Sequence, residues 1–269
     1  EDIHYVSSSE AEVSPVGFKL KIKSSIPQAV VLDRVSYIKS IAAKAQLLGS
    51  KILLDNNVVS VSVKDTGVEI ITDKGESFIS KIVVIATGFH SPLLKDLSII
   101  KKDVRQEYMV ASQAIVRVND IEGIQVYLGK QNVPGSFAWL VPTHEQNALI
   151  GMFTRSRLQG HMSKLITELS KDGIVDAVIK SHSQWGIPAA PIGRTFSDRL
   201  LVVGDAAGLV KPTTGGGIYY SFISGEIAAE VICDAIESDS FSYKTLRSYQ
   251  TKWKTVLNNE IQIGLNARK

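Results

Sequence analysis

Residues 200–232 read LLVVGDAAGLVKPTTGGGIYYSFISGEIAAEVI, and this stretch decides the class of fold. Its first four residues are all apolar, a pattern typical of a strand that is covered on both faces in a parallel sheet. Gly204 ends the strand, and Asp205 follows at its carboxyl end, where open α/β sheets hold their ligands. The apolar residues beyond Ile218 predict a long helix. The stretch therefore predicts a strand, a loop and a helix of an α/β domain.

Small residues dominate the loop between this strand and this helix. Residues 206–208, Ala-Ala-Gly, are too small to block a bulky ligand beside Asp205. Residues 215–217 are three glycines, which are costly inside a helix but at its start let a ligand approach the backbone. Free N–H groups and the positive end of the helix dipole attract an anion there. The alternative is a tight connection without a ligand, but so many small residues beside one acid favour a ligand site.

Composition excludes several classes of protein. The chain has 269 residues, of which 44% are hydrophobic, so it can form one large domain or two modest ones. A net charge of +3 with 21% charged residues does not indicate a nucleic-acid-binding protein. The sequence shows neither a membrane-spanning stretch nor a signal peptide, and the five histidines are too scattered for a metal site. The single cysteine, Cys233, excludes an intramolecular disulfide and is expected to be a buried thiol in the long helix.

Two further parts of the chain show their own patterns. Asp33 is a good N-cap for a helix that runs to about Leu48, with an apolar stripe along one side. Strands are expected at residues 51–54, 58–63, 68–72 and 78–85, and the last of them returns to the main sheet. From about residue 105 to 185 the pattern changes to strands at 109–118, 125–128, 136–141 and 148–153, then a helix at 162–179. This order predicts an inserted antiparallel sheet with one covering helix.

The tail from residue 243 to 267 is expected to be a helix. Its apolar residues fall on one side of a helical turn, which predicts that this side is buried; they are Leu246, Tyr249, Trp253, Leu257 and Ile261. The fold class is thus α/β with α+β character.

Four stretches resemble the geranylgeranyl reductase family, FAD-dependent enzymes related to the aromatic hydroxylases. Residues 204–208, 212–218 and 224–225 resemble its second flavin-binding motif. Asp33-Arg34 is similar to the place of the family's arginine that contacts FAD, and residues 86–88, Ala-Thr-Gly, stand where relatives have a similar tripeptide. Residues 137–142, FAWLVP, resemble the aromatic-x-Trp-x-x-Pro stretch that lines the family's isoprenoid site.

The resemblance implies a set of site residues. Those that would bind the cofactor are Arg34, Ala86, Thr87, Gly88, Gly204, Asp205, Ala206, Gly208, Pro212, Gly215, Gly216, Gly217 and Ile218. Asp205 would accept hydrogen bonds from hydroxyls of the ribityl chain, and the helix start would stabilise negative charge on the reduced flavin. Phe137, Trp139 and Pro142 would line the substrate site, although aromatic residues on strands are as often part of a core. No catalytic residue is identified.

The sequence departs from the family in two respects, one of which is the absence of the family's cysteine-containing motif near the flavin. It also contains no Gly-x-Gly-x-x-Gly, the fingerprint that holds the pyrophosphate of FAD. We therefore expect a remainder of a Rossmann-like FAD-binding domain that lacks its N-terminal βαβ unit. The expected division is residues 1–104 and 188–240 for the FAD-binding domain, 105–187 for the substrate domain and 241–269 for a C-terminal helix.

Three functions follow as hypotheses. The first is an FAD-dependent reductase of isoprenoid double bonds in lipid biosynthesis, with NAD(P)H or ferredoxin as electron donor. It would be cytoplasmic, would contact a prenyl-lipid substrate and transiently the membrane surface, and would bind no nucleic acid. The second is an FAD-dependent aromatic monooxygenase or halogenase of the same fold, and the third is a non-catalytic fragment that cannot hold FAD.

Overall fold

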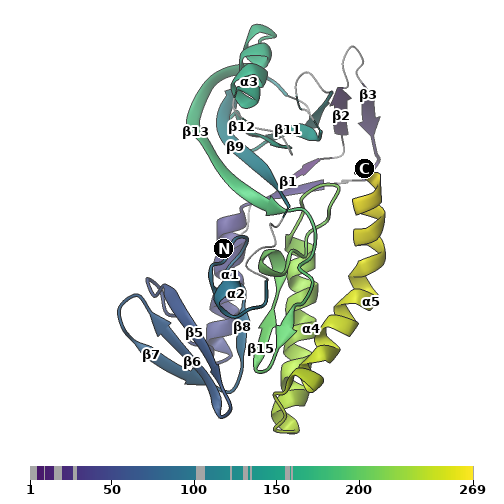
Figure 1. Ribbon diagram of the computed structural model, residues 1–269. Coiled ribbons are helices and arrows are strands. Elements are labelled where there is room, and N and C mark those ends of the chain that lie inside the picture. Colours follow the sequence, from purple (N-terminus) through teal and green to yellow (C-terminus); the bar gives the residue numbers. More distant parts are fainter. Residues whose placement is uncertain are drawn as a thin grey trace. The chain divides into compact units, whose positions relative to one another are not determined.

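A computed structural model describes residues 5–8, 10–14, 20–26, 29–100, 107–121, 123–129, 133, 135–154, 158 and 160–268 (Figure 1). The chain divides into two compact units. Unit 1 comprises residues 1–53 and 109–185, and unit 2 comprises residues 54–108 and 186–269. The segments of each unit are separated in sequence, as expected when one domain is inserted into another.

Unit 1 is built on a seven-stranded sheet with the order β13-β9-β12-β11-β10-β2-β3. The pairs β9–β12, β12–β11, β11–β10 and β2–β3 are antiparallel, whereas β2 and β10 are parallel. A second, two-stranded sheet joins β1 to β4. The elements of unit 1 are β1 (Tyr5–Ser8), β2 (Glu10–Ser14), β3 (Leu20–Lys23), β4 (Ala29–Leu32), α1 (Arg34–Leu47), β9 (Tyr108–Val118), β10 (Ile124–Leu128), β11 (Phe137–Pro142), β12 (Asn147–Thr154), α3 (His161–Lys171) and β13 (Val175–Pro188).

The core of unit 1 lies between α3 and one face of this sheet. Alternate residues of β9, β11 and β12 point to this face and are buried, because successive side chains of a strand lie on opposite faces. They pack with the apolar side of α3; the cluster includes Ala114, Val116, Ala138, Leu140, Ala148, Ile150, Met162, Leu165 and Leu169. The predicted antiparallel sheet with one covering helix is confirmed.

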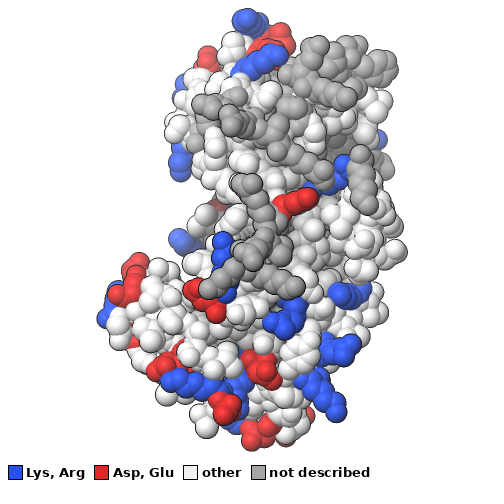
Figure 2. All heavy atoms as spheres, viewed as in Figure 1, with Lys and Arg blue, Asp and Glu red and all other residues white. Residues whose placement is uncertain are grey.

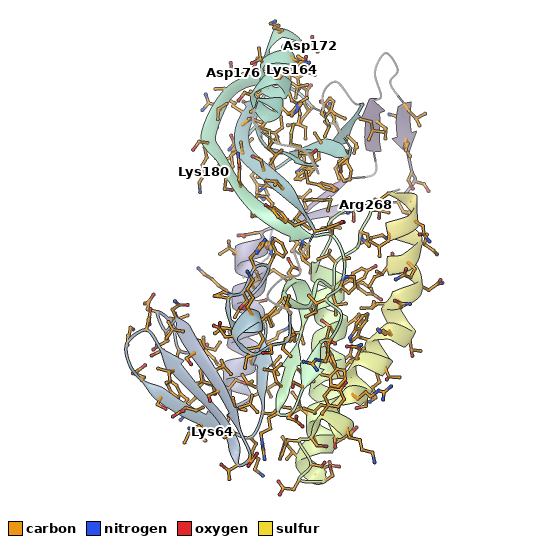
Figure 3. The ribbon with its side chains drawn as sticks, in the orientation of Figure 1. Lys64, Lys164, Asp172, Asp176, Lys180 and Arg268 are labelled. Carbon is orange, nitrogen blue, oxygen red and sulfur yellow. The ribbon has the colours of Figure 1, made fainter. Side chains whose placement is uncertain are left out.

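The predicted helix at residues 162–179 is wrong in its second half. α3 ends at Lys171, and the N–H group of Gly173 (φ +72°) donates to the carbonyl of Ser170 at 3.1 Å. Figure 3 labels Asp172 at this helix end and Asp176 and Lys180 on the strand that follows. Asp172-Gly173 is a common helix stop. The apolar residues after it fit either a helix or a strand, and pairing with the sheet makes them the long strand β13.

Unit 2 contains two three-stranded sheets and the long helices α4 and α5. In one sheet β15 pairs in parallel with β8 and antiparallel with β14, and in the other β5, β6 and β7 form an antiparallel meander. The elements of unit 2 are β5 (Val58–Lys64), β6 (Gly67–Thr72), β7 (Ser77–Ser80), β8 (Val83–Ile85), α2 (Leu93–Asp96), β14 (Phe196–Ser197), β15 (Leu200–Val202), the 3-10 helix η1 (Gly204–Ala207), α4 (Ile218–Glu237) and α5 (Tyr243–Ala267).

The predicted meander and its return to the main sheet are confirmed, with one break. The single strand expected at residues 78–85 is divided, because β7 belongs to the meander and β8 to the sheet of β15. Residues 51–54, expected as a strand, lie outside every helix and strand. On the face shown in Figure 2, Lys and Arg are interspersed with Asp and Glu over unit 2.

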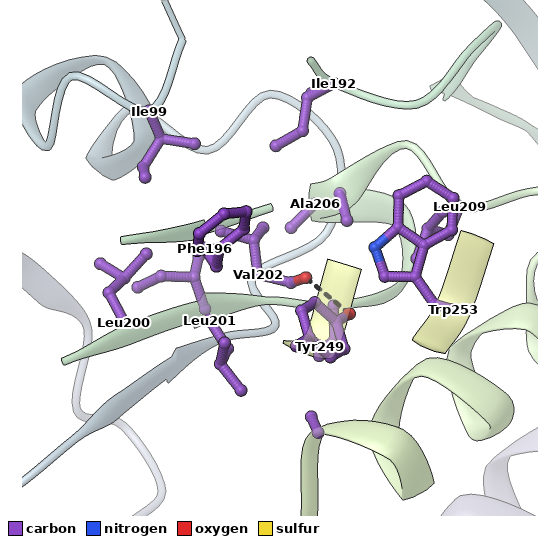
Figure 4. Close-up of a cluster of buried hydrophobic side chains, with 14 of the residues drawn as sticks. Ile99, Ile192, Phe196, Leu200, Leu201, Val202, Ala206, Leu209, Tyr249 and Trp253 are labelled. Carbon is purple, nitrogen blue, oxygen red and sulfur yellow. Dashed lines mark hydrogen bonds between the residues drawn. The ribbon is translucent and has the colours of Figure 1, made fainter. Parts of the chain in front are cut away.

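The core of unit 2 forms where β15 meets α4 and α5 (Figure 4). Leu200, Leu201 and Val202 are fully buried, as expected for a strand covered on both faces. The hydroxyl group of Tyr249 donates a hydrogen bond to the carbonyl of Val202 at 2.9 Å, and burial raises the pKa of this tyrosine. The predicted apolar side of α5 is buried throughout, so this helix is confirmed from its first residue to its last.

The expected burial of Cys233 is wrong, and α1 is less buried than the other long helices. Cys233 is exposed on α4, because the buried face of that helix passes through Val231 and Ala235 instead. α1 begins after its predicted cap, with the Asp33 carboxylate accepting from the N–H of Val35 at 2.9 Å, but the helix has no buried residue.

Candidate functional site

Two strand ends lie side by side in unit 2. Because β8 and β15 are parallel, Ile85 stands opposite Val202, and both strands end at the same edge of the sheet. The N–H group of Val203 donates to the carbonyl of Ile85 at 3.1 Å. Residues 86–88 therefore lie beside residues 204–205, and Ala86 and Thr87 are exposed there. The carboxyl edge of such a sheet is where open α/β folds bind ligands.

The turn after β15 depends on two glycines. Gly204 has φ +56°, donates its N–H to Ser224 Oγ of α4 at 3.1 Å, and would place a Cβ only 2.7 Å from Ser221 Oγ. Gly208 has φ +70°, and a Cβ there would collide with the carbonyl oxygen of Ala190. No other residue combines this conformation with this packing. The close contacts fix η1, which carries Asp205, against the start of α4.

Asp205 faces the first turn of α4. A Cβ on Gly217 would collide with its carboxylate oxygen and would lie 3.3 Å from a methyl group of Val210. Asp205 is half-buried, and Gly217, the N-cap residue of α4, has no side chain that could cap the helix. The backbone N–H groups of this turn and a carboxylate therefore lie at one place, so a ligand can meet both a set of donors and a charged acceptor.

The glycine-rich loop, residues 209–217, closes on itself through its backbone. Lys211 donates its N–H to the carbonyl of Gly216 at 3.0 Å, and Gly215 (φ +69°) donates to the carbonyl of Lys211 at 2.9 Å. A cavity of about 380 Å³ opens here, lined by Lys211, Gly216, Ile218, Tyr219, Tyr220 and Glu260. A larger hollow of about 430 Å³, beside Arg194 and the first half of α5, contains no residue of this loop.

The cavity contains a charged pair from the loop and α5. Lys211 Nζ lies 2.7 Å from Glu260 Oε1, and both side chains are nearly half exposed. The ammonium group of Lys211, and next the nearby Tyr220 hydroxyl, hold the pKa of Glu260 below its ordinary value. Burial, and then the Glu260 carboxylate, raise the pKa of Tyr220, which is 2% exposed. At neutral pH Glu260 is therefore a carboxylate and Tyr220 a neutral phenol.

Unit 1 holds the other predicted site residues. Arg34 is the first residue of α1 and is exposed. Phe137 and Trp139 lie on the face of the sheet opposite α3, where each makes a ring contact with Phe153 at 4.8 and 6.3 Å between centroids. The indole of Trp139 lies across Gly151 on the neighbouring strand, with no room for a Cβ between them. Pro142 ends β11 and is half-buried.

The structure thus gathers the predicted residues of unit 2 at one edge of one sheet. Arg34 and the aromatic stretch belong to the other unit, and their roles stay predictions. Sequence reasoning missed Glu260, Tyr220 and Gly151. Tyr220 lies within the quoted stretch, two residues after the motif residues 212–218, but Glu260 lies 49 residues after Lys211, and no local pattern connects them.

The described residues contain neither a metal-binding cluster nor a membrane-spanning helix. No cluster of three or more His, Cys, Asp or Glu side chains there could hold a metal ion. None of the helices in the described part combines the length and the apolar character that a membrane crossing requires.

Comparison with known proteins identifies the family. A family described as FAD dependent oxidoreductase matches residues 2–231. The chain belongs to the FAD-dependent oxidoreductases. It is 30% identical over 267 residues to the digeranylgeranylglycerophospholipid reductase of Methanocaldococcus jannaschii, a match that covers 95% of this chain and 68% of the relative. It is 28% identical to digeranylgeranylglycerophospholipid reductase 2 of Methanopyrus kandleri, over 89% of this chain and 64% of the relative.

These relatives confirm the resemblance to geranylgeranyl reductases, and the chain spans about two thirds of their length. A solved structure of a geranylgeranyl bacteriochlorophyll reductase-like protein from Thermoplasma acidophilum gives a TM-score of 0.83 at 23% identity, over 97% of this chain and 70% of that one. A probable FAD-dependent monooxygenase from Pseudomonas aeruginosa gives 0.73 at 16% identity, over 97% and 78%. At these identities both structures show the fold, and the predicted α/β flavoprotein fold is confirmed.

The residues of unit 2 fit the cofactor of this family. The start of α4, the exposed Gly216 in front of it and the half-buried Asp205 bring backbone N–H groups and a carboxylate to one place. A Cβ on Gly88 would have no neighbour within 4 Å, so the backbone at the tip of β8 is not covered by other side chains at this residue.

Proposed function

We propose that the whole protein is an FAD-dependent reductase that saturates C=C bonds in the isoprenoid chains of lipid precursors. The observation that carries the proposal is the position of Asp205, which faces the glycine-rich start of α4 beside the parallel tip of β8. The names of the reductase relatives support the substrate class. FAD, when bound, would supply the transfer of a hydride to the substrate.

Each residue group of unit 2 would have its own task at the flavin. Asp205 would accept hydrogen bonds from ribityl hydroxyls, and its charge would strengthen them. The N–H groups around Gly216, Gly217 and Ile218 would face the pyrimidine edge and stabilise the negative charge of the reduced ring. Ala86, Thr87, Gly88 and Gly215, which are exposed or half-buried, would let the ring approach the backbone. Gly204, Ala206, Gly208 and Pro212 are buried and would shape the site beneath the ring.

Residues of unit 1 would complete the binding of cofactor and substrate. Arg34 is exposed and would reach the phosphates of FAD. Phe137 and Trp139 lie on the sheet face that α3 leaves free, and with Pro142 they would form an apolar wall for a prenyl chain. The electron donor would be NAD(P)H or ferredoxin, and the protein would be cytoplasmic, with transient contact with a membrane surface to reach its prenyl-lipid substrate.

The division of tasks follows from this proposal. Residues 1–104 and 188–240 would form the FAD-binding part, residues 105–187 the substrate-binding part, and residues 241–269 a C-terminal helix. The compact units begin the second part at residue 109 and end it at 185, and they group residues 1–53 with it. The boundary at 104/105 lies outside the described residues.

The second candidate is an aromatic monooxygenase or halogenase, which the fold of the Pseudomonas aeruginosa protein supports. Turnover separates the two, because a reductase saturates a prenyl lipid without oxygen whereas a monooxygenase or halogenase requires it. Reduction of a prenyl lipid by anaerobically reduced enzyme, in the full-length protein, would support the reductase. A chain that binds no FAD would instead support the non-catalytic hypothesis.

The first experiment is a titration of the 269-residue chain with FAD, followed by flavin fluorescence. Asp205→Ala should weaken binding about tenfold or more, since the hydrogen bonds of a charged acceptor contribute about 1.5–3 kcal/mol. Asp239→Ala is the matched control, because Asp239 is an exposed carboxylate that pairs with Lys81 at 3.2 Å on the same unit. Equal affinity of the Asp205 variant and the wild type would contradict the proposed site.

A further inference from the structure

The last turns of α5 contact the glycine-rich loop at two places. Glu260 pairs with Lys211 at 2.7 Å, and Gly264, one helical turn later, packs against Pro212. Lys211 and Pro212 are neighbours in the loop, and Glu260 and Gly264 lie on one side of the helix because they are four residues apart. Two independent contacts, one ionic and one steric, therefore hold the same short segment of the loop.

Gly264 packs so closely against Pro212 that a Cβ atom fits only if one of the two residues shifts by a few tenths of an ångström. A Cβ on this buried residue would lie 3.1, 3.2 and 3.3 Å from the Cδ, Cβ and Cγ atoms of Pro212. These distances are below ordinary van der Waals contact, so an added methyl group must displace either the proline or the helix. The helix backbone consequently touches the loop directly, and glycine is the residue that permits this approach.

Glu260 contacts Lys211, the loop residue whose backbone hydrogen bonds hold Gly215 and Gly216. Lys211 both donates a backbone hydrogen bond to Gly216 and accepts one from Gly215, so its position determines where the glycines before α4 lie. Glu260 also lies near the hydroxyl of Tyr220, in the first turn of α4. The Glu260 carboxylate of α5 thus lies close both to the glycine-rich loop, at Lys211, and to the first turn of α4, at Tyr220.

We propose that Glu260 and Gly264 are positioning residues, which hold Lys211 and Pro212 so that residues 215–217 leave the start of α4 open to the flavin. The proposal rests on the proposed flavin site and deepens it: the shape of the site is set by a helix about 50 residues further along the chain. Neither residue touches the flavin in this proposal. They act through the loop.

Amide hydrogen exchange and FAD affinity, measured on the 269-residue chain, test the proposal without turnover. Glu260→Gln removes the ion pair but keeps the shape of the side chain. It should speed exchange of the Lys211 and Gly215 amides in the FAD-free chain and weaken FAD binding, each about threefold, the size of effect that an exposed ion pair can have. Glu230→Gln is the matched control, since Glu230 of α4 pairs with Lys252 of α5 at 3.2 Å, with similar exposure and no contact to the loop.

Gly264→Ala tests the steric contact. It should weaken FAD binding about tenfold, because added methyl groups in well-packed sites displace their neighbours. Its control is Gly225→Ala in α4, where the new Cβ would have no atom within 4 Å. Both variants exchange a helical glycine for alanine, so they share the gain in helix propensity.

The outcomes distinguish the positioning role of Glu260 and Gly264 from the proposed flavin binding itself. Faster loop exchange and weaker FAD binding in Glu260→Gln and Gly264→Ala, with both controls unchanged, would support the positioning role. Wild-type exchange in both test variants would overturn it, as would equal losses in the controls, since helix packing in general would then account for the effect. A wild-type chain that binds no FAD would overturn the proposed function, while the exchange data would still decide whether α5 positions the loop.

Discussion

In unit 2 glycine brings the backbone close to a carboxylate, whereas in unit 1 it makes room for an aromatic ring. Gly217 lies against Asp205 at the start of α4, and Gly151 lies beneath the indole of Trp139. The first arrangement presents N–H groups and a charge, and the second presents a flat apolar surface. In the proposed function the two units would therefore offer different kinds of ligand contact: backbone N–H groups and the Asp205 carboxylate in unit 2, and aromatic side chains in unit 1.

The strongest test of this comparison is Gly208→Ala in unit 2. Its Cβ would collide with the backbone oxygen of Ala190, and alanine disfavours φ +70°, so the variant should lose about 3 kcal/mol of unfolding free energy. Urea unfolding measures the loss. Gly193→Ala is the control, because a Cβ there has no neighbour within 4 Å, and equal stability of the two variants would contradict the packing at Gly208.

A smaller effect is expected for Gly151→Ala in unit 1. The added methyl group would displace the Trp139 indole, whose Nε1 atom would lie only 2.8 Å from it, at a cost of about 1–2 kcal/mol because the ring can move. Tryptophan fluorescence and thermal melting report the change. FAD affinity should stay that of the wild type if the two units act as different ligand surfaces, and a tenfold loss of affinity would break the comparison.

The smallest effect is the pH dependence of the pair between Lys211 and Glu260. The pKa of Glu260 is lowered from its ordinary value of 4.5, so the folded state favours the carboxylate. Its contribution to stability is fully present above pH 4.5 and is lost as the pH falls through the lowered pKa. The difference in melting temperature between wild type and Glu260→Gln should therefore shrink from pH 6 towards pH 3, and a difference that grows on acidification would contradict the pair.

Local patterns in the sequence predicted the elements whose stability is local or strictly periodic. Asp33 caps α1 as expected because its carboxylate bonds to N–H groups two and three residues away. α5 was predicted from end to end because one face repeats apolar residues at helical spacing. The apolar run of β15 and the acid after it also predicted where the candidate site lies.

Distant contacts decided the remaining features. The residues after Gly173 have apolar character that suits a helix or a strand, and only pairing with the sheet made them β13. Cys233 is exposed because the packing of α4 on its neighbours, rather than its composition, selects the buried face. The sequence by itself determined the strand, the glycine-rich loop and the helices of unit 2, since each depends on neighbouring residues. Tertiary structure alone brought Glu260 to Lys211 and Trp139 to Gly151, because these contacts join strands or helices whose meeting is set by the whole core.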